Sequence, residues 1–259
     1  MTTHNSTGSS HSLFILLSIP GLEDQHTWMS LPFFISYLVA FLGNSLIIFI
    51  IITECSLHEP MYLFLCMLAV ADLILSTTTV PKALAIFWFY AGAISLGGCV
   101  TQIFFIHATF IEESGILLAM ALDRYVAISH PLHYALTMNS RRCVLLVAVS
   151  WVITILHALV HTLLVTRLSF CGPNIIPHFF CDLVPLLKLA CSSTCVNDLV
   201  LILVAGTLLI APFVCILMSY FYIALAILRI DSPRGKQRAF SSCTSPLSVV
   251  SLFYSTAIG

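Results

Sequence analysis

Three consecutive residues, Asp123, Arg124 and Tyr125, place a carboxylate, a guanidinium and a phenol at the end of a long apolar segment. An arginine at such a border can pair with the neighbouring carboxylate in one state and offer its planar guanidinium to another partner in a second state. The other interpretation is a charged stop at the end of a membrane helix. Because three-residue motifs often occur by chance, both interpretations stay open at this point.

Three further polar residues, Asn44, Asp72 and Glu113, lie inside apolar segments. Polar groups are costly in a membrane, so they usually face the interior of a helical bundle and mark function. Glu113 precedes Arg124 by nearly three helical turns and should share its face, whereas Glu112 points about 100° away around the helix. For Asp72 the alternative is a hydrogen-bonded core residue with no further role.

A stripe of four residues precedes these acids. His107, Phe110, Ile111 and Ser114 recur at positions i, i+3, i+4 and i+7, which places them on one helix face. Such a stripe is often plain core packing. It also suits one wall of a ligand pocket, because helical bundles bind small molecules between apolar walls with a few polar groups.

Cysteines gather near one predicted loop. Cys171, Cys181, Cys191 and Cys195 lie between two apolar segments, and Cys99 opens another segment on the same side. If that side is oxidising, five thiols leave one unpaired, and the connectivity stays undetermined. A metal site is the rival interpretation, but no C-x-x-C pair occurs, so we expect neither a metal nor a cofactor.

The composition predicts a membrane protein. Of 259 residues 59% are hydrophobic and 8% charged, against roughly 25% charged in soluble domains. A net charge of -1 gives no basic surface for nucleic acid. A bilayer needs about 20 apolar residues per helix, and six segments qualify, near residues 29–52, 61–80, 99–125, 143–164, 199–228 and 239–259. No nucleophile with a base and no phosphate loop appears, so we expect no enzyme.

The basic residues predict the orientation. Residues 1–28 should form an extracellular tail, and residues 29–259 a single transmembrane domain. Most Lys and Arg residues fall on one side of the predicted helices, and that side should be cytoplasmic. They are Arg124, Arg141, Arg142, Arg229, Arg234, Lys236 and Arg238, against Lys82, Arg167 and Lys188. The N-terminus is then outside, where Asn5 of the sequon Asn-Ser-Thr is expected to be glycosylated.

Longer motifs carry a resemblance. The run MALDRYVAISHPLHY from Met120 to Tyr134 resembles the olfactory receptors of the rhodopsin-like G-protein-coupled receptor class. GNSLI around Asn44, LAVADLILS around Asp72 and RAFSSC from Arg238 are similar to the corresponding family segments. The resemblance covers nearly the whole chain from Leu13 onward. Some stretches look like the fish-like class of these receptors and others like the tetrapod class.

This resemblance implies an all-α membrane protein with a rhodopsin-like transmembrane helical bundle. Six of the usual seven helices are found, so we expect a truncated or incomplete receptor. The implied function is binding of a small volatile odorant and signalling to a heterotrimeric G protein of the stimulatory olfactory type. The implied location is the plasma membrane of olfactory cilia. The implied disulfides are Cys99–Cys181 and Cys171–Cys191.

The resemblance also assigns roles to single residues. Tyr220 should meet the switch arginine, and Asn44 and Asp72 should belong to an inner polar network, often around a sodium ion, to which Glu113 adds an acid. The facing walls of the ligand pocket would be Val204, Ala205, Leu208 and Tyr254. G proteins would dock beside Arg234, Lys236 and Arg238, which equally suit an orientation anchor or contacts to anionic lipid.

One departure and two rival functions remain. Ser245-Pro246 replaces a Ser-His pair that is usual in the family, and its effect on G-protein coupling is an open question. A transporter or channel would suit six helices with intramembrane acids, but inverted repeats and broken helices are not found. The other rival is a truncated receptor that does not signal.

Overall fold

The computed structural model describes residues 13–17, 26–54, 56, 59–132, 134, 140–171 and 174–258. Asn5, the predicted glycosylation site, lies outside these residues. Within them, five helical stretches are long and apolar enough to cross a membrane. They run over Trp28–Thr53, Pro60–Phe89, Leu96–Ser129, Arg141–Thr166 and Cys195–Leu228.

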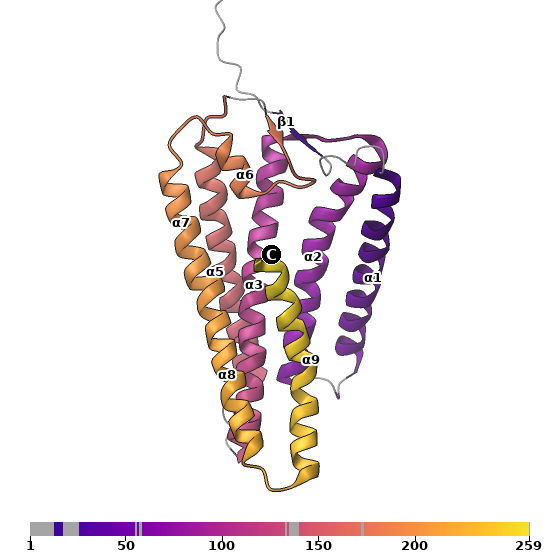
Figure 1. Cartoon of the computed structure of the whole chain (residues 1–259), viewed down its shortest axis with the longest axis vertical. Coiled ribbons are helices and arrows are strands. Elements are labelled where there is room, and N and C mark those ends of the chain that lie inside the picture. Colours follow the sequence, from indigo (N-terminus) through magenta and orange to yellow (C-terminus); the bar gives the residue numbers. More distant parts are fainter. Residues whose placement is uncertain are drawn as a thin grey trace, which may run out of the picture. The chain divides into compact units, whose positions relative to one another are not determined.

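The architecture is mostly helical, which confirms the predicted all-α class (Figure 1). The long helices are α1 (His26–Thr53), α2 (Pro60–Phe89), α3 (Leu96–Ser129), α5 (Ser140–Thr166), α7 (Cys195–Ala205), α8 (Ala211–Leu228) and α9 (Pro233–Ile258). Each of the six predicted segments is helical over its described residues. The last of them, in α9, is not among the five apolar spans, so its crossing of the membrane stays a prediction.

The chain divides into two compact units, and the long helices α1, α2, α3 and α5 each contribute to both. The first unit comprises Met1–Gly43, Leu73–Ala108 and Ile155–Ile202. The second comprises Asn44–Asp72, Thr109–Thr154 and Leu203–Gly259. Each unit has its own buried apolar core.

The first unit contains a small sheet that the sequence did not predict. Strand β1 (Leu13–Leu16) lies between β2 (Ala93–Ser95), which is antiparallel to it, and β3 (Ile175–Ile176), which is parallel. Phe14 and Leu16 alternate with exposed neighbours and are almost fully buried in the core around Cys99 and Cys181. Part of the predicted extracellular tail is therefore a strand. It hydrogen-bonds to two loop segments, and its alternate side chains are buried in the core.

The first unit also extends a predicted segment. The segment expected near residues 61–80 continues as helix α2 through Pro81 to Phe89. Proline removes a backbone donor, so carbonyl groups of the preceding turn need other partners. The Gln102 side chain supplies one such bond, since its Nε2 donates to the Thr78 carbonyl at 2.9 Å.

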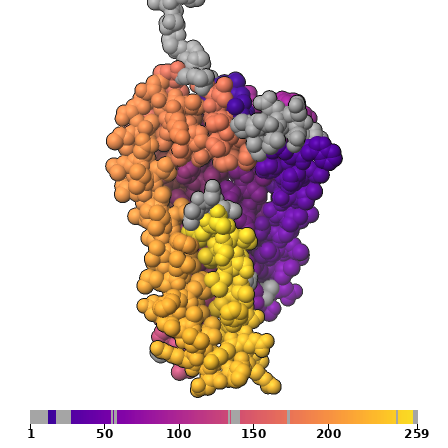
Figure 2. Space-filling view, in the orientation of Figure 1, coloured from indigo at the N-terminus to yellow at the C-terminus, as the bar shows by residue number. Residues whose placement is uncertain are grey.

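The second unit packs α8 and α9 along each other (Figure 2, orange and yellow). Its core contains Phe64, Leu117, Met120 and Ile216, all at most 2% exposed. Between α7 and α8, residues Gly206–Ile210 form a π-helical stretch, labelled η3. Pro212 is the second residue of α8, one position beyond the end of this stretch. Because proline has no N–H to donate to the carbonyl four residues earlier, the wider π-helical turn accommodates Pro212 before the regular helix continues.

Candidate functional site

The predicted switch arginine is paired with its neighbour. Arg124 Nη2 donates to Asp123 Oδ2 at 2.9 Å, and the Asp123 side chain is fully buried. Tyr134 Oη donates to the other carboxylate oxygen, Oδ1, at 2.8 Å. Burial and this bond to Asp123 raise the pKa of the Tyr134 phenol, which therefore keeps its proton and acts as a donor. Both oxygens of Asp123 are thus engaged.

Tyr134 is the functional residue that the sequence did not single out. It stands in the Met120–Tyr134 motif, but it lies beyond the end of α3 at Ser129. Helical periodicity could not place it beside Asp123. The signal that could have found it is chemical: a buried carboxylate needs more than one donor, and the motif ends in a phenol.

Two buried polar atoms near this ion pair lack a hydrogen bond. Arg124 Nε and Tyr220 Oη both have no hydrogen-bond partner among the residues that the structure describes. Tyr220 packs against the core of the second unit, which includes Met120 and Ala121 of α3. Tyr125 packs against other aromatic rings. Its ring centroid lies 6.2 Å from that of Tyr222 and 6.0 Å from that of His130. The structure thus keeps Tyr125 out of the ion pair.

The predicted inner polar residues come together. Asp72 makes side-chain hydrogen bonds to Asn44 and Glu113. Glu113 is 4% exposed, and its Oε1 has no partner within the described part of the chain. Two adjacent carboxyl groups are stable only with a proton or a cation between them. Their hard oxygen atoms suit the sodium ion that the resemblance implies.

Glu112 lies on a different helix face from Glu113, as the 100° between consecutive residues predicts. Glu112 is fully buried, and its Oε2 accepts bonds from Ser150 at 2.8 Å and Thr154 at 3.4 Å on α5.

Part of the predicted ligand stripe is assembled. Ser114 Oγ and Tyr254 Oη lie 2.8 Å apart and are both buried. Phe110 packs its ring on Phe253 at 4.9 Å. His107, in the first unit, is hydrogen-bonded through Nδ1 to the Ile103 carbonyl at 3.0 Å. Ile111 is buried.

The other predicted walls lie at the end of α7 and in η3. Val204 and Ala205 end α7, where Val204 is buried and Ala205 half-buried, and Leu208 is half-buried within η3. The contacts described for these three residues do not join them to Ser114 or Tyr254.

A cavity of about 490 Å³ lies between α8 and α9. Tyr254, from the predicted ligand pocket, and Tyr220, from the predicted switch, both line it. The other lining residues are Phe213, Ile216, Leu217, Leu247, Val250, Ser251 and Ser255. One continuous space therefore touches both candidate sites within the second unit.

Both disulfides implied by the resemblance are present. Cys99 bonds Cys181, and Cys171 bonds Cys191, with Cα atoms 5.3 and 5.8 Å apart. Gln102 Oε1 accepts the Cys181 backbone N–H at 2.8 Å. Cys195 remains a free, exposed thiol.

The basic residues that precede the last predicted segment belong to the same helix as that segment. Arg234, Lys236 and Arg238 lie in the first turns of α9, and both arginines are exposed. The helix begins here because Pro233 is compatible with a first turn and Ser232 Oγ accepts the Gly235 N–H at 3.3 Å.

In the described ranges, no group of three or more His, Cys, Asp or Glu side chains could hold a metal ion.

Comparison with known proteins identifies the family. Residues 33–259 match the sequence pattern of a family described as "Olfactory receptor". The chain is 49% identical to human Olfactory receptor 52B4, 49% identical to rat Olfactory receptor 1468 and 49% identical to mouse Olfactory receptor 1E16. Each alignment covers 100% of this chain and 82% of the relative. The chain therefore belongs to the olfactory receptor family of G-protein-coupled receptors.

Proposed function

We propose that this protein is an odorant receptor of the plasma membrane that transmits binding of a small volatile molecule to a heterotrimeric G protein of the stimulatory olfactory type. The observation that carries the proposal is the state of Arg124. Its guanidinium is held by Asp123, while its Nε and the Tyr220 hydroxyl are both buried and have no hydrogen-bond partner in the described part of the chain.

A buried donor and a buried hydroxyl group in the same unit, neither with a hydrogen-bond partner among the described residues, favour a second arrangement. An unsatisfied buried polar group costs about 1–3 kcal/mol. A movement that brings Arg124 to Tyr220 would satisfy both groups and at the same time break the pair with Asp123. The described structure is then the closed state, and the second arrangement is the one that presents Arg124 to a G protein.

The cavity between α8 and α9 offers a route from ligand to switch. Tyr254 and Tyr220 line the same space. A ligand that binds better when α9 moves away from α8 shifts the population toward that arrangement, since a ligand acts only through its differential affinity for two states. The mostly apolar lining suits a small apolar odorant with one or two polar atoms.

The basic start of α9 would lie at the cytoplasmic face. Arg234, Lys236 and Arg238 would meet the G protein there, or anionic lipid headgroups in its absence. This orientation, with an extracellular N-terminus, follows the distribution of Lys and Arg and is part of the proposal. Olfactory cilia are the proposed location.

The test is nucleotide exchange by the purified chain in lipid nanodiscs with the G-protein heterotrimer. We expect octanal, octanoic acid or octyl acetate to accelerate exchange in a saturable way. Arg167→Ala, which removes an exposed arginine at the end of α5, serves as the control and should respond like the unchanged chain. Absence of stimulation by the three compounds, together with solute flux in liposomes, would replace the receptor with a transporter.

A further inference from the structure

Glu112 is a buried acid that the proposed switch does not use. Its side chain is fully buried, and Oε2 is occupied by the hydroxyl groups of Ser150 and Thr154. The other oxygen, Oε1, has no hydrogen-bond partner within the ranges that the structure covers. A buried carboxyl oxygen without a partner is costly and points to a missing group.

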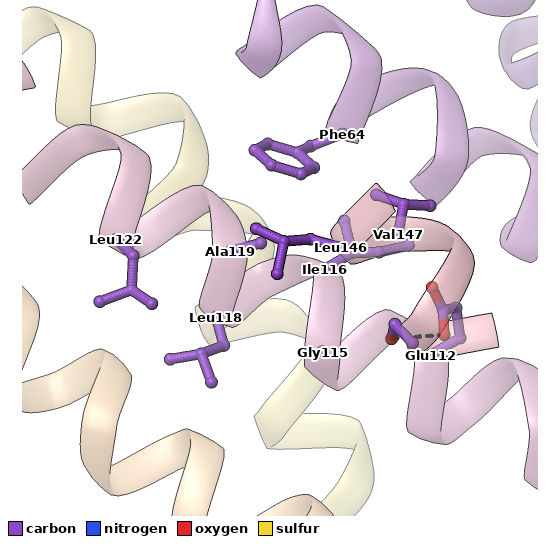
Figure 3. A pocket seen from close by; sticks show the side chains of 10 residues that line it. Phe64, Glu112, Gly115, Ile116, Leu118, Ala119, Leu122, Leu146 and Val147 are labelled. Atoms are coloured by element: carbon purple, nitrogen blue, oxygen red, sulfur yellow. Dashed lines mark hydrogen bonds between the residues drawn. The ribbon is translucent and has the colours of Figure 1, made fainter. Parts of the chain in front are cut away.

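A cavity of about 210 Å³ lies against this acid (Figure 3). Glu112 and Ser150 supply its polar end, where the dashed bond joins them. The remaining lining is apolar and comes from α2, α3 and α5: Phe64, Gly115, Ile116, Leu118, Ala119, Leu122, Leu146 and Val147. Leu122 and Leu146 are 41% and 58% exposed, so the cavity opens at the side of the helices, toward lipid.

Water does not suit this space. A buried water needs two to four polar partners. The cavity offers Glu112 and Ser150, and the Ser150 hydroxyl already donates to Glu112. The occupant must therefore be mostly apolar and carry one polar group at its end.

We propose that this cavity is a second small-molecule site, which binds a short-chain aliphatic alcohol with its hydroxyl on Glu112 Oε1 and its chain along Ile116 and Ala119. A hydroxyl both donates and accepts, so it pairs with the carboxyl group in either protonation state. At about 30 Å³ for each water-sized group, the volume holds about seven heavy atoms, the size of hexanol. A sterol ring system is too large.

This site is independent of the proposed odorant response. Its lining does not include Ser114, Tyr254 or Tyr220. Binding can therefore be measured without a G protein, and either proposal can fail while the other stands.

The experiment is photolabelling of the purified chain in nanodiscs with a diazirine-bearing hexanol, followed by mass spectrometry of peptides. We expect label on α3 between residues 112 and 122 and on α5 between residues 146 and 150. An excess of 1-hexanol should remove most of this label, whereas hexane at the same membrane concentration should not. Equal competition by hexane, or competition by cholesterol, would overturn the assignment.

Three variants sharpen the test. Ala119→Phe fills the cavity and should reduce the label at least tenfold, whereas Ala148→Phe makes the same change at an exposed position on α5 outside the lining and should leave it unchanged. Glu112→Met should abolish the advantage of hexanol over hexane as a competitor. Undiminished label in a folded Ala119→Phe chain would contradict the site. If that variant does not fold, the competition between hexanol and hexane in the unchanged chain still tests the proposal.

Discussion

At the scale of single residues, the central feature is a carboxylate that holds two groups at once. Asp123 accepts a bond from Arg124 through one oxygen and from Tyr134 through the other. A fully buried carboxylate is stable only when it is paired and hydrogen-bonded. Tyr134 therefore helps to hold Asp123 in position, which in turn keeps Arg124 in the closed arrangement.

Tyr134→Phe should raise the basal activity of the receptor. The change removes one hydrogen bond to a charged group, worth roughly 1.5 kcal/mol or more, so the closed state should lose about tenfold in population relative to the open state. Basal nucleotide exchange without odorant measures this directly. Tyr222→Phe keeps the ring that contacts Tyr125 and should leave the basal rate unchanged. Equal basal rates in the two variants would show that Tyr134 does not help Asp123 to hold Arg124 in the closed arrangement.

The sequence predicted the pair and missed the third member for a physical reason. Asp123 and Arg124 adjoin each other, and an acid beside an arginine at a helix end indicates an ion pair without any knowledge of the fold. Tyr134 reaches Asp123 only because the chain changes direction after α3. A contact that depends on such a reversal has no fixed spacing in the sequence.

At the scale of elements, the helices were predictable and the exceptions within and between them were not. Long apolar runs indicated every long helix, since a single segment can satisfy its own backbone in lipid only as a helix. The end of α2 was missed because Gln102 stabilises the turn before Pro81, a contact between two helices. Strand β1 was missed because four residues form a strand only where two partners flank them.

The contact between α3 and α9 gives a prediction at this scale. Ser114→Ala should leave the buried Tyr254 hydroxyl without its partner and lower the stability by about 1–3 kcal/mol. Adding Tyr254→Phe should recover most of this loss, because removing both polar groups leaves nothing unsatisfied. Thermal unfolding of the single and double variants in detergent forms a double-mutant cycle. Strictly additive losses would mean that the two hydroxyl groups do not interact.

At the scale of the whole molecule, the chain is a multi-pass membrane protein and not an enzyme, because it belongs to the olfactory receptor family. The sequence predicted this class, because its motifs are specific and its composition excludes a soluble domain. It did not predict two units with separate cores, since the helices run uninterrupted through both. Only packing, which is not visible along one helix, divides them.

The two disulfides should contribute unequally to stability. Cys99 and Cys181 are 82 residues apart and fully buried in the core of the first unit, whereas Cys171 and Cys191 are 20 residues apart and exposed. Loop-closure entropy alone gives the first bond an advantage of about 1 kcal/mol. Replacing Cys99 and Cys181 by serine should therefore lower the unfolding temperature more than replacing Cys171 and Cys191. The opposite order would mean that the first unit does not depend on its buried bond.

The most direct measurement of the whole account is odorant-stimulated nucleotide exchange by the Arg124→Ala variant in nanodiscs. We predict that stimulation is lost in a variant that still reaches the cell surface, although its unfolding temperature should fall below that of the Arg167→Ala control because the buried Asp123 loses its ionic partner. Arg124→Lys should recover little of it, because a lysine lacks the planar, multiply donating group. Full stimulation by a correctly folded Arg124→Ala chain would contradict the proposal that this guanidinium is the latch between odorant and G protein.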